Sequence, residues 1–190
     1  MKIAPLGREA TLDDLWEFED PAELIDGRIV PMSPTGNHPG YAASRIRRSL
    51  DEHAETRGGG FGVSESVGFI LQTPATQLFV PDAAWWTGPD EADLLHGAPP
   101  FAAEVRSRSD YGPAAERAMA IKRAHYFAGG TQVVWDVDVL REGCVRVYRA
   151  DDPEHPTVYR RGEVADAEPA VPGWRMRVDE LFKPAMPASS

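Results

Sequence analysis

Residues 101–137 read FAAEVRSRSDYGPAAERAMAIKRAHYFAGGTQVVWDV, and this stretch decides the fold class. Its mostly apolar start at 101–106 predicts a short strand, and the β-branched run at 131–137 predicts a second, buried strand. Between them, residues 113–128 predict a long helix that opens with Pro113 and stops at Gly129-Gly130. One helix joining two buried strands indicates an α/β or α+β sandwich.

The segments on either side extend this pattern into a mixed sheet core flanked by helices. The pair Asp26-Gly27 predicts the turn of a hairpin over residues 24–30. An apolar residue at every fourth position predicts a helix over 40–57. A short helix is expected at 11–18, and strands or strand-like segments are expected at 61–71, 78–86, 145–149, 157–161 and 171–182. We expect a single domain over residues 1–190, with an irregular arm at 1–10 and a frayed tail at 183–190.

Composition and charge narrow the function classes. The chain has 190 residues, and 20 Lys and Arg against 30 Asp and Glu give a net charge of −10. This balance disfavours a protein that coats nucleic acid, so a nucleic-acid function would need a local basic patch or metal ions that bridge carboxylates to phosphate. The single cysteine, Cys144, excludes an intramolecular disulfide and a cysteine-based zinc site. Apolar runs are too short to cross a membrane and no secretory signal is visible, so we expect a soluble, cytoplasmic protein.

Two carboxylates in apolar surroundings form the main candidate site. Asp82 and Glu104 each fall inside a predicted apolar strand, where a carboxylate is costly unless it is paired or binds a cation. Neighbouring buried carboxylates repel each other, and Mg²⁺ relieves that repulsion with oxygen ligands and retained waters. Lys122 shares a helix face with Tyr126 and must point at something polar. Each residue alone also fits a simpler interpretation: a salt bridge for either carboxylate, and a solvated surface side chain for Lys122.

Several short motifs follow one another in a fixed order between residues 20 and 150. They are Glu23-Leu24-Ile25-Asp26-Gly27-Arg28, Met32-Ser33-Pro34, His38, Val80-Pro81-Asp82, Glu104-Val105-Arg106-Ser107, and Lys122 with Tyr126, Gly129 and Trp135. Together they resemble the Uma-two-type restriction endonuclease family, within the PD-(D/E)XK nuclease superfamily. The resemblance implies a restriction-endonuclease-like mixed β-sheet core flanked by helices, with an extra N-terminal hairpin and C-terminal strands.

The resemblance also implies a metal centre. Asp82, Glu104 and the backbone carbonyl of Val105 would hold Mg²⁺ or Mn²⁺. Glu23 resembles the acidic residue that such nucleases add from an N-terminal segment, which would make it an outer metal ligand. Lys122 would orient the attacking water or stabilise the negative charge of the transition state.

One position departs from the superfamily pattern. The usual lysine lies two residues after the glutamate, where this chain has Arg106. Arginine stays protonated, so it can stabilise charge but cannot act as a base. In the narrower family the following helix supplies the lysine, which matches Lys122. As weaker expectations, His38, Arg106 and Tyr126 would contact substrate or water.

Three function classes follow from these observations. The first is a metal-dependent DNA endonuclease, expected to act as a homodimer because two strand cuts suit a two-fold pair. The second is a nuclease-like fold without catalysis that serves as a binding module, suggested by the acidic charge and by Arg106. The third is a metal-dependent hydrolase of small phosphorylated substrates, which the negative net charge also suits.

Overall fold

A computed structural model describes residues 8–184, and a six-stranded sheet forms the centre of the fold. The strand order is β11-β10-β9-β8-β6-β3. The strands are β3 (Phe61–Ser64), β6 (Ala83–Trp86), β8 (Phe101–Val105), β9 (Val133–Asp138), β10 (Cys144–Arg149) and β11 (Asp152–Arg160). Strands β8 and β9 pair in parallel, and the other neighbours in this sheet are antiparallel.

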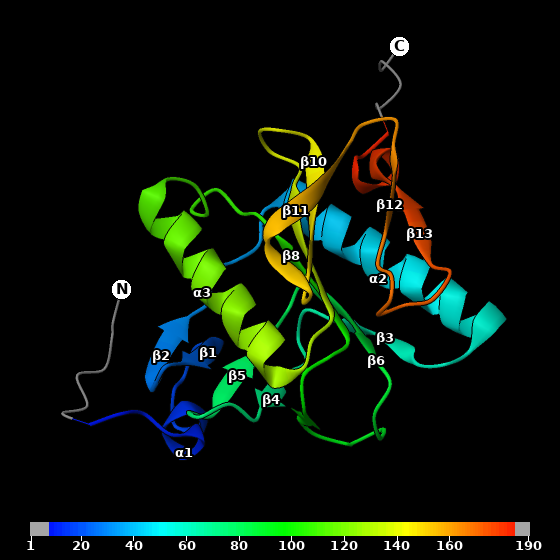
Figure 1. Ribbon diagram of the computed structural model, residues 1–190. Helices are drawn as coiled ribbons and strands as arrows, with labels where there is room; N and C mark the ends of the chain where they lie inside the picture. Colours follow the sequence, from blue (N-terminus) through cyan, green and yellow to red (C-terminus); the bar gives the residue numbers. More distant parts are fainter. Residues whose placement is uncertain (1–7, 185–190) are drawn as a thin grey trace, which may run out of the picture.

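Two long helices cover opposite faces of this sheet (Figure 1). Helix α3 (Pro113–Gly129) makes the crossover from β8 to β9, which confirms the predicted strand–helix–strand unit. Helix α2 (Asn37–Arg57) packs against β3, β6 and β8. It begins three residues before the predicted start at residue 40, because Pro39 lies in the first turn, where proline costs no helical hydrogen bond.

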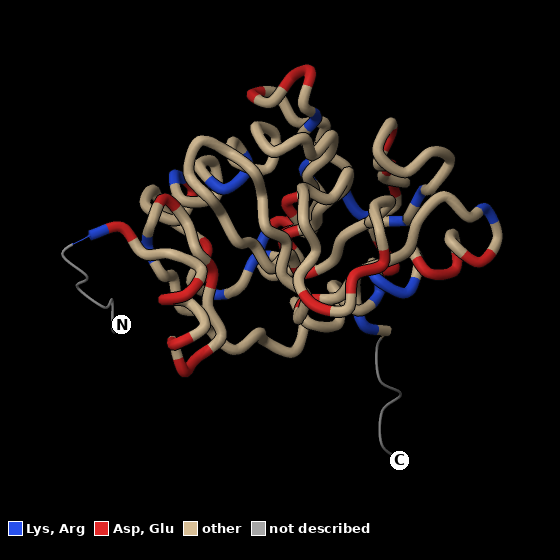
Figure 2. Tube along the Cα trace, turned by 90° about the horizontal axis from the view of Figure 1, so that it is seen from below, with Lys and Arg blue, Asp and Glu red and all other residues tan. Residues whose placement is uncertain are grey.

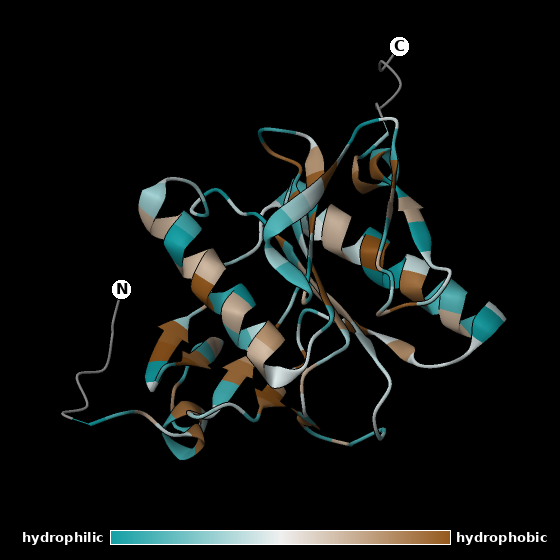
Figure 3. Cartoon of the chain, viewed as in Figure 1, coloured by the Kyte–Doolittle hydropathy of each residue, from teal (hydrophilic) through white to brown (hydrophobic). Residues whose placement is uncertain are grey.

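Alternation along the central strands separates two apolar cores. On β8, Phe101, Ala103 and Val105 belong to the core on the α2 side, and Ala102 belongs to the core on the α3 side. Successive side chains of a strand point to opposite faces, so Glu104 continues the α3 side. Figure 3 shows apolar residues on the central strands, and both apolar and polar residues on the two helices that flank them. The carboxylate of Glu104 is therefore placed beneath α3 by strand geometry.

A second sheet, of five strands, lies beside α3 (Figure 1). Its order is β2-β1-β5-β4-β7, with β1 (Ala22–Ile25), β2 (Arg28–Pro31), β4 (Phe69–Leu71), β5 (Gln77–Phe79) and β7 (Leu95–His96). The hairpin β1–β2 turns through Asp26 (φ 48°) and Gly27 (φ 66°), both left-handed, as the Asp-Gly pair predicts. A Cβ at Gly27 would lie 2.7 Å from the Cβ of Glu9, so the turn also needs glycine for space.

Two predicted strands are wrong, because each divides between the two sheets. The segment 78–86 splits into β5 and β6, with residues 80–82 between them. Pro81 has no N–H to donate to a ladder, so the chain leaves one sheet here and enters the other. The segment 61–71 splits in the same way into β3 and β4. Asp82 therefore lies immediately before β6, and not inside a continuous strand.

The two ends of the described chain complete the fold. Short helix α1 (Leu12–Trp16) is capped by Thr11, whose hydroxyl accepts from the amide of Asp14. The C-terminal segment forms β12 (Val164–Asp166), β13 (Arg175–Arg177) and a 3-10 turn, η1 (Val178–Leu181), that contacts α2. The expected arm and tail fall largely on residues 1–7 and 185–190, outside the described range. Within residues 8–184, no helix has the length and apolar character needed to cross a membrane.

Candidate active site

A cavity of about 310 Å³ opens between α3, the β1–β2 hairpin and the ends of β8 and β9. It is lined by Asp82 and Glu104 from the central region, by Lys122 and Tyr126 from α3, and by Glu23 from β1. Sequence segments that are far apart thus supply the five side chains to one place. The cavity holds most of the residues that the sequence singled out.

Two residues of α3 donate hydrogen bonds to the carboxylate of Glu104. The hydroxyl of Tyr126 donates to Glu104 Oε1 at 2.8 Å, and the Nζ of Lys122 donates to Oε2 at 2.9 Å. Lys122 and Tyr126 are four residues apart, so they lie on the same face of the helix. Both therefore reach the carboxylate that alternation on β8 turns towards α3.

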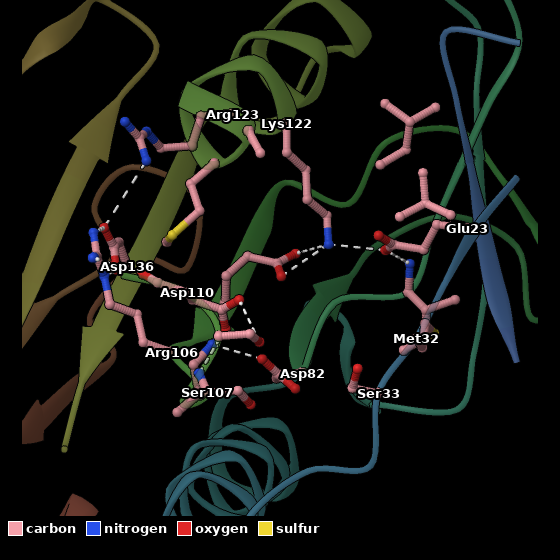
Figure 4. A pocket seen from close by; sticks show the side chains of 18 of the residues that line it. Glu23, Met32, Ser33, Asp82, Arg106, Ser107, Asp110, Lys122, Arg123 and Asp136 are labelled. Carbon is pink, nitrogen blue, oxygen red and sulfur yellow. Dashed lines mark hydrogen bonds and ion pairs between the residues drawn. The ribbon is translucent and has the colours of Figure 1, made fainter. Parts of the chain in front are cut away.

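Lys122 forms a bridge between two carboxylates. Its Nζ lies 2.8 Å from Glu23 Oε1 and 2.9 Å from Glu104, and Figure 4 shows the side chain reaching from α3 towards Glu23. The same Glu23 oxygen accepts the backbone N–H of Val80 at 2.7 Å. Glu23 thus fixes both the ammonium group and the segment that leads into Asp82.

Asp82 reaches the end of β8 from the neighbouring segment. Its Oδ2 accepts the backbone N–H of Val105 at 2.6 Å, beside Glu104. Burial raises the pKa of Asp82 to about 6, although the Val105 hydrogen bond and Lys122 oppose the shift. The carboxyl is therefore costly to ionise in its present surroundings.

Burial and neighbouring charges also shift the pKa values of the other titratable groups in the cavity. Burial raises the pKa of Glu104 to about 7; Lys122 opposes this, while Glu23 and Asp82 add to it by repulsion. Burial alone would lower the pKa of Lys122, but the attraction of Glu104 and Glu23 outweighs it and the net shift is upward. Burial and the nearby Glu104 raise the pKa of Tyr126 well above its ordinary value. The lysine is therefore a fixed cation, and the two central carboxyls are groups that a further cation would favour in the ionised form.

A second charged cluster stands beside the first. Arg106 donates to both oxygens of Asp136 at 2.6 Å and also contacts Glu116. Arg106 and Asp136 are only 4% and 1% exposed, and the Asp136 hydrogen bonds raise the pKa of Arg106 further. Arg106, which occupies the usual lysine position, thus uses its guanidinium to bind carboxylates of the protein itself. Its backbone and side chain still line the cavity.

Other predicted residues lie in different places. His38 is exposed in the first turn of α2 and does not line the cavity. On α3, a histidine that was not among the predicted site residues, His125, pairs with Asp26, with 2.9 Å between Nε2 and Oδ1. Val105 lines the cavity and uses its N–H for Asp82. Within residues 8–184, no three His, Cys, Asp or Glu side chains cluster closely enough to hold a metal by themselves.

Sequence reasoning did not select Asp136 as a site residue, although it lines the cavity together with Arg123, one of several basic residues close to the candidate site in the sequence. Asp136 is opposite Glu104 in the parallel register of β8 and β9, on the same face of the sheet. An Asp in the middle of the otherwise apolar run 131–137 was the available signal. Arg123 neighbours Lys122 in the sequence, but only the packing of α3 shows that both face the cavity.

Comparisons with known proteins identify the family and the fold of the chain. A family model named Uma2 and described as "Putative restriction endonuclease" matches residues 13–179. The chain belongs to this family. One solved structure, titled as a putative nuclease belonging to DUF820 from Anabaena variabilis, matches at a TM-score of 0.74 and 19% identity, covering 90% of this chain and 97% of that one. No curated protein sequence matches the chain significantly.

Membership in the Uma2 family confirms the resemblance read from the short motifs, which lie within the matched range. The structural likeness confirms the restriction-endonuclease-like α+β fold. The nuclease class is supported at the level of the family description. The metal, the substrate and the roles of single residues are questions for the site itself.

Proposed function

We propose that this Uma2 chain is a Mg²⁺- or Mn²⁺-dependent DNA endonuclease that hydrolyses phosphodiester bonds. The observation that carries the proposal is the convergence of Asp82, Glu104 and Lys122 on one cavity in a chain of this family. Two carboxylates can hold a divalent cation, and a lysine can stabilise the negative charge that develops on a phosphate during hydrolysis. Family membership alone would not supply this geometry.

The donor set fits a hard divalent cation. Asp82 and Glu104 line one cavity, and burial raises their pKa values in spite of Lys122, so their negative charge is only partly compensated. Mg²⁺ is commonly bound by one or two carboxylates plus waters, so a larger cluster of protein ligands is unnecessary. We assign Asp82, Glu104 and the carbonyl of Val105 to the metal. When bound there, the cation would polarise a phosphodiester oxygen and lower the pKa of a water.

Lys122 is the catalytic cation of the chain itself. Its ammonium group stays protonated, because its pKa is raised by Glu104 and Glu23 against the effect of burial. It therefore stabilises negative charge that develops on the phosphate, and it can orient a water through its N–H groups. Tyr126 positions Glu104 by its hydrogen bond and is not a proton donor to substrate.

Glu23 acts on the site through Lys122. Its Oε1 is occupied by the ammonium group and by the amide of Val80, so it is better suited to positioning than to outer metal coordination. If Glu104 held a cation, the contact with Glu23 would still fix Lys122. Arg106 likewise supports the site by holding Asp136 and Glu116, and not by contacting substrate.

A nicking assay on supercoiled plasmid tests the proposal, with Mg²⁺, Mn²⁺ and EDTA arms at low salt. Wild type should nick in either metal and not in EDTA, while Glu104→Gln should lose at least about a hundredfold in rate. Glu52→Gln removes one exposed carboxylate from α2, far in sequence from the cavity, and serves as the matched control. Equal activity of Glu104→Gln and wild type would refute the assignment of the site.

Absence of cleavage in every metal arm would instead favour the binding-module class. A parallel arm with small phosphate esters tests the third class, because turnover of these esters without plasmid nicking would identify a small-substrate hydrolase. We further propose that the active species is a homodimer, since one chain carries one such site. Double-strand breaks that appear only above the dimerisation concentration are the expected result.

A further inference from the structure

Three arginines converge on one buried carboxylate at the side of the cavity. Asp136 of β9 is bound by Arg106, and it also lies 3.9 Å from Arg123 of α3 and 4.0 Å from Arg146 of β10. Each of these arginines comes from a different element. Figure 4 shows Arg106 and Arg123 on two sides of Asp136 at the edge of the cavity.

The three arginines differ in how many carboxylates lie at hydrogen-bonding distance from each guanidinium. Arg106 takes both oxygens of Asp136, and its other nitrogens contact Glu116. Arg146 bonds Glu142 at 2.6 Å. Arg123 is left with the 3.9 Å contact, which is too long for a hydrogen bond, and its buried Nη1 has no hydrogen-bond partner among the described residues. One guanidinium in this cluster therefore lacks an anion at bonding distance.

The position of Arg123 is nevertheless well determined. Its guanidinium lies 4.0 Å from the centre of the Tyr148 ring, and the side chain is 15% exposed. Such stacking orders the guanidinium before any ligand arrives, so less conformational entropy is lost on binding. Arg123 also lines the cavity that contains Asp82, Glu104 and Lys122. An unsaturated, ordered cation thus faces the proposed reaction centre.

Arg123 differs from the other cations of the cavity wall in its hydrogen bonding. In Figure 2 the Lys and Arg positions alternate with Asp and Glu positions along the described chain. On the cavity wall, the ammonium group of Lys122 lies between Glu23 and Glu104, and the guanidinium of Arg106 is bonded to Asp136 and Glu116. Of these three cations, Arg123 is the one without a carboxylate among the described residues at hydrogen-bonding distance.

We propose that Arg123 binds a phosphate group of the substrate, the backbone phosphate next to the one that is cleaved. The guanidinium donates to non-bridging phosphate oxygens, a charge-assisted contact that arginine geometry suits. This inference rests on the proposed nuclease function for the identity of the ligand. The anion site itself rests only on the contacts of Arg123.

The test measures binding to a short DNA duplex by fluorescence anisotropy in Ca²⁺ over a series of salt concentrations. Arg123→Gln should weaken binding several-fold and reduce the slope of log K against log salt by about 1, the value for one lost phosphate contact. Arg117→Gln is the matched control, because Arg117 is exposed on the same helix and does not line the cavity. A slope for Arg123→Gln equal to that of the control would overturn the proposal.

A second measurement separates this inference from the nuclease function. Inorganic phosphate should raise the thermal unfolding midpoint of wild type and not that of Arg123→Gln, whose midpoint without phosphate also reports whether it is folded. If wild type cleaves no DNA but shows this phosphate effect, the anion site stands and the nuclease function fails. If wild type cleaves DNA and phosphate stabilises both proteins equally, the nuclease function stands and the anion site fails.

Discussion

Removing the ammonium group of Lys122 should destabilise the metal-free protein by several kcal/mol at pH 8. The Lys122→Met substitution keeps an unbranched side chain of similar length beside Tyr126 and removes the charge. It leaves the carboxylates of Glu23 and Glu104 facing each other without a cation between them. Side-chain exposures of 9% and 20% give these carboxylates little water as a replacement.

The magnitude follows from the two ion-pair distances. At 2.8 and 2.9 Å, with an effective dielectric constant near 20, each pair is worth about 6 kcal/mol of gross attraction. The cost of burying the ammonium group offsets a large part of this sum. Removal of one partner from a buried pair typically costs about 3–5 kcal/mol, and we expect Lys122→Met to fall in that range.

Chemical denaturation with urea at pH 8 and pH 5.5, in EDTA, measures the effect. The loss should shrink at pH 5.5, because Glu104, already raised to about 7 in the wild type, takes up a proton and no longer needs a counter-ion. Lys122 itself stays protonated at both values, since its folded pKa is raised above the usual 10.5. Lys183→Met, which removes an exposed ammonium group bonded to Asn37, is the control. A loss below about 1 kcal/mol at pH 8, or one independent of pH, would refute this account of the site.

Two further predictions concern the neighbouring charges. In the metal-free wild type, Asp82 and Glu104 have raised folded pKa values, so the folded state holds more protons than the unfolded state. The free energy of unfolding should therefore fall from pH 5 to pH 8 by roughly 4 kcal/mol. Asp82→Asn should flatten this slope in urea titrations, and an unchanged slope would contradict the assignment. Asp136→Asn should cost about 3–5 kcal/mol by leaving buried Arg106 undercompensated, and a joint Arg106→Met, Asp136→Leu replacement should recover much of it, whereas additive losses would show that the pair is not coupled.

The parts of the fold that local signals specify could be predicted from the sequence. Pro113 and Gly129-Gly130 delimit α3, and Asp26-Gly27 makes the hairpin turn, because these residue types have conformations that hardly depend on distant contacts. The division of 61–71 and 78–86 between two sheets could not be predicted in this way. Apolar runs specify burial, but they do not specify which sheet supplies the hydrogen bonds.

The candidate site shows the same limit at the level of single residues. Glu104, Lys122 and Tyr126 were accessible to sequence reasoning because strand alternation and helical spacing place them on defined faces. The role of Glu23 was not accessible, since its contacts with Val80 and Lys122 join positions that are distant in the sequence. A family pattern can mark Glu23 as a candidate, but only the packing shows that its carboxylate contacts the Val80 amide and the Lys122 ammonium group.

The contacts of Lys122 also show how an acidic chain could keep the proposed metal site ready for a cation. Without a cation, Glu104 is stabilised by Lys122 and Tyr126, and Asp82 by the amide of Val105. These partners lower the cost of burying carboxylates but leave both pKa values raised, so compensation is incomplete. In the proposed function a divalent cation would complete this compensation, and Glu23 would still hold Lys122. Such a site would need no broad basic surface, because the cation, Lys122 and Arg123 together would present the positive charge that a phosphate requires.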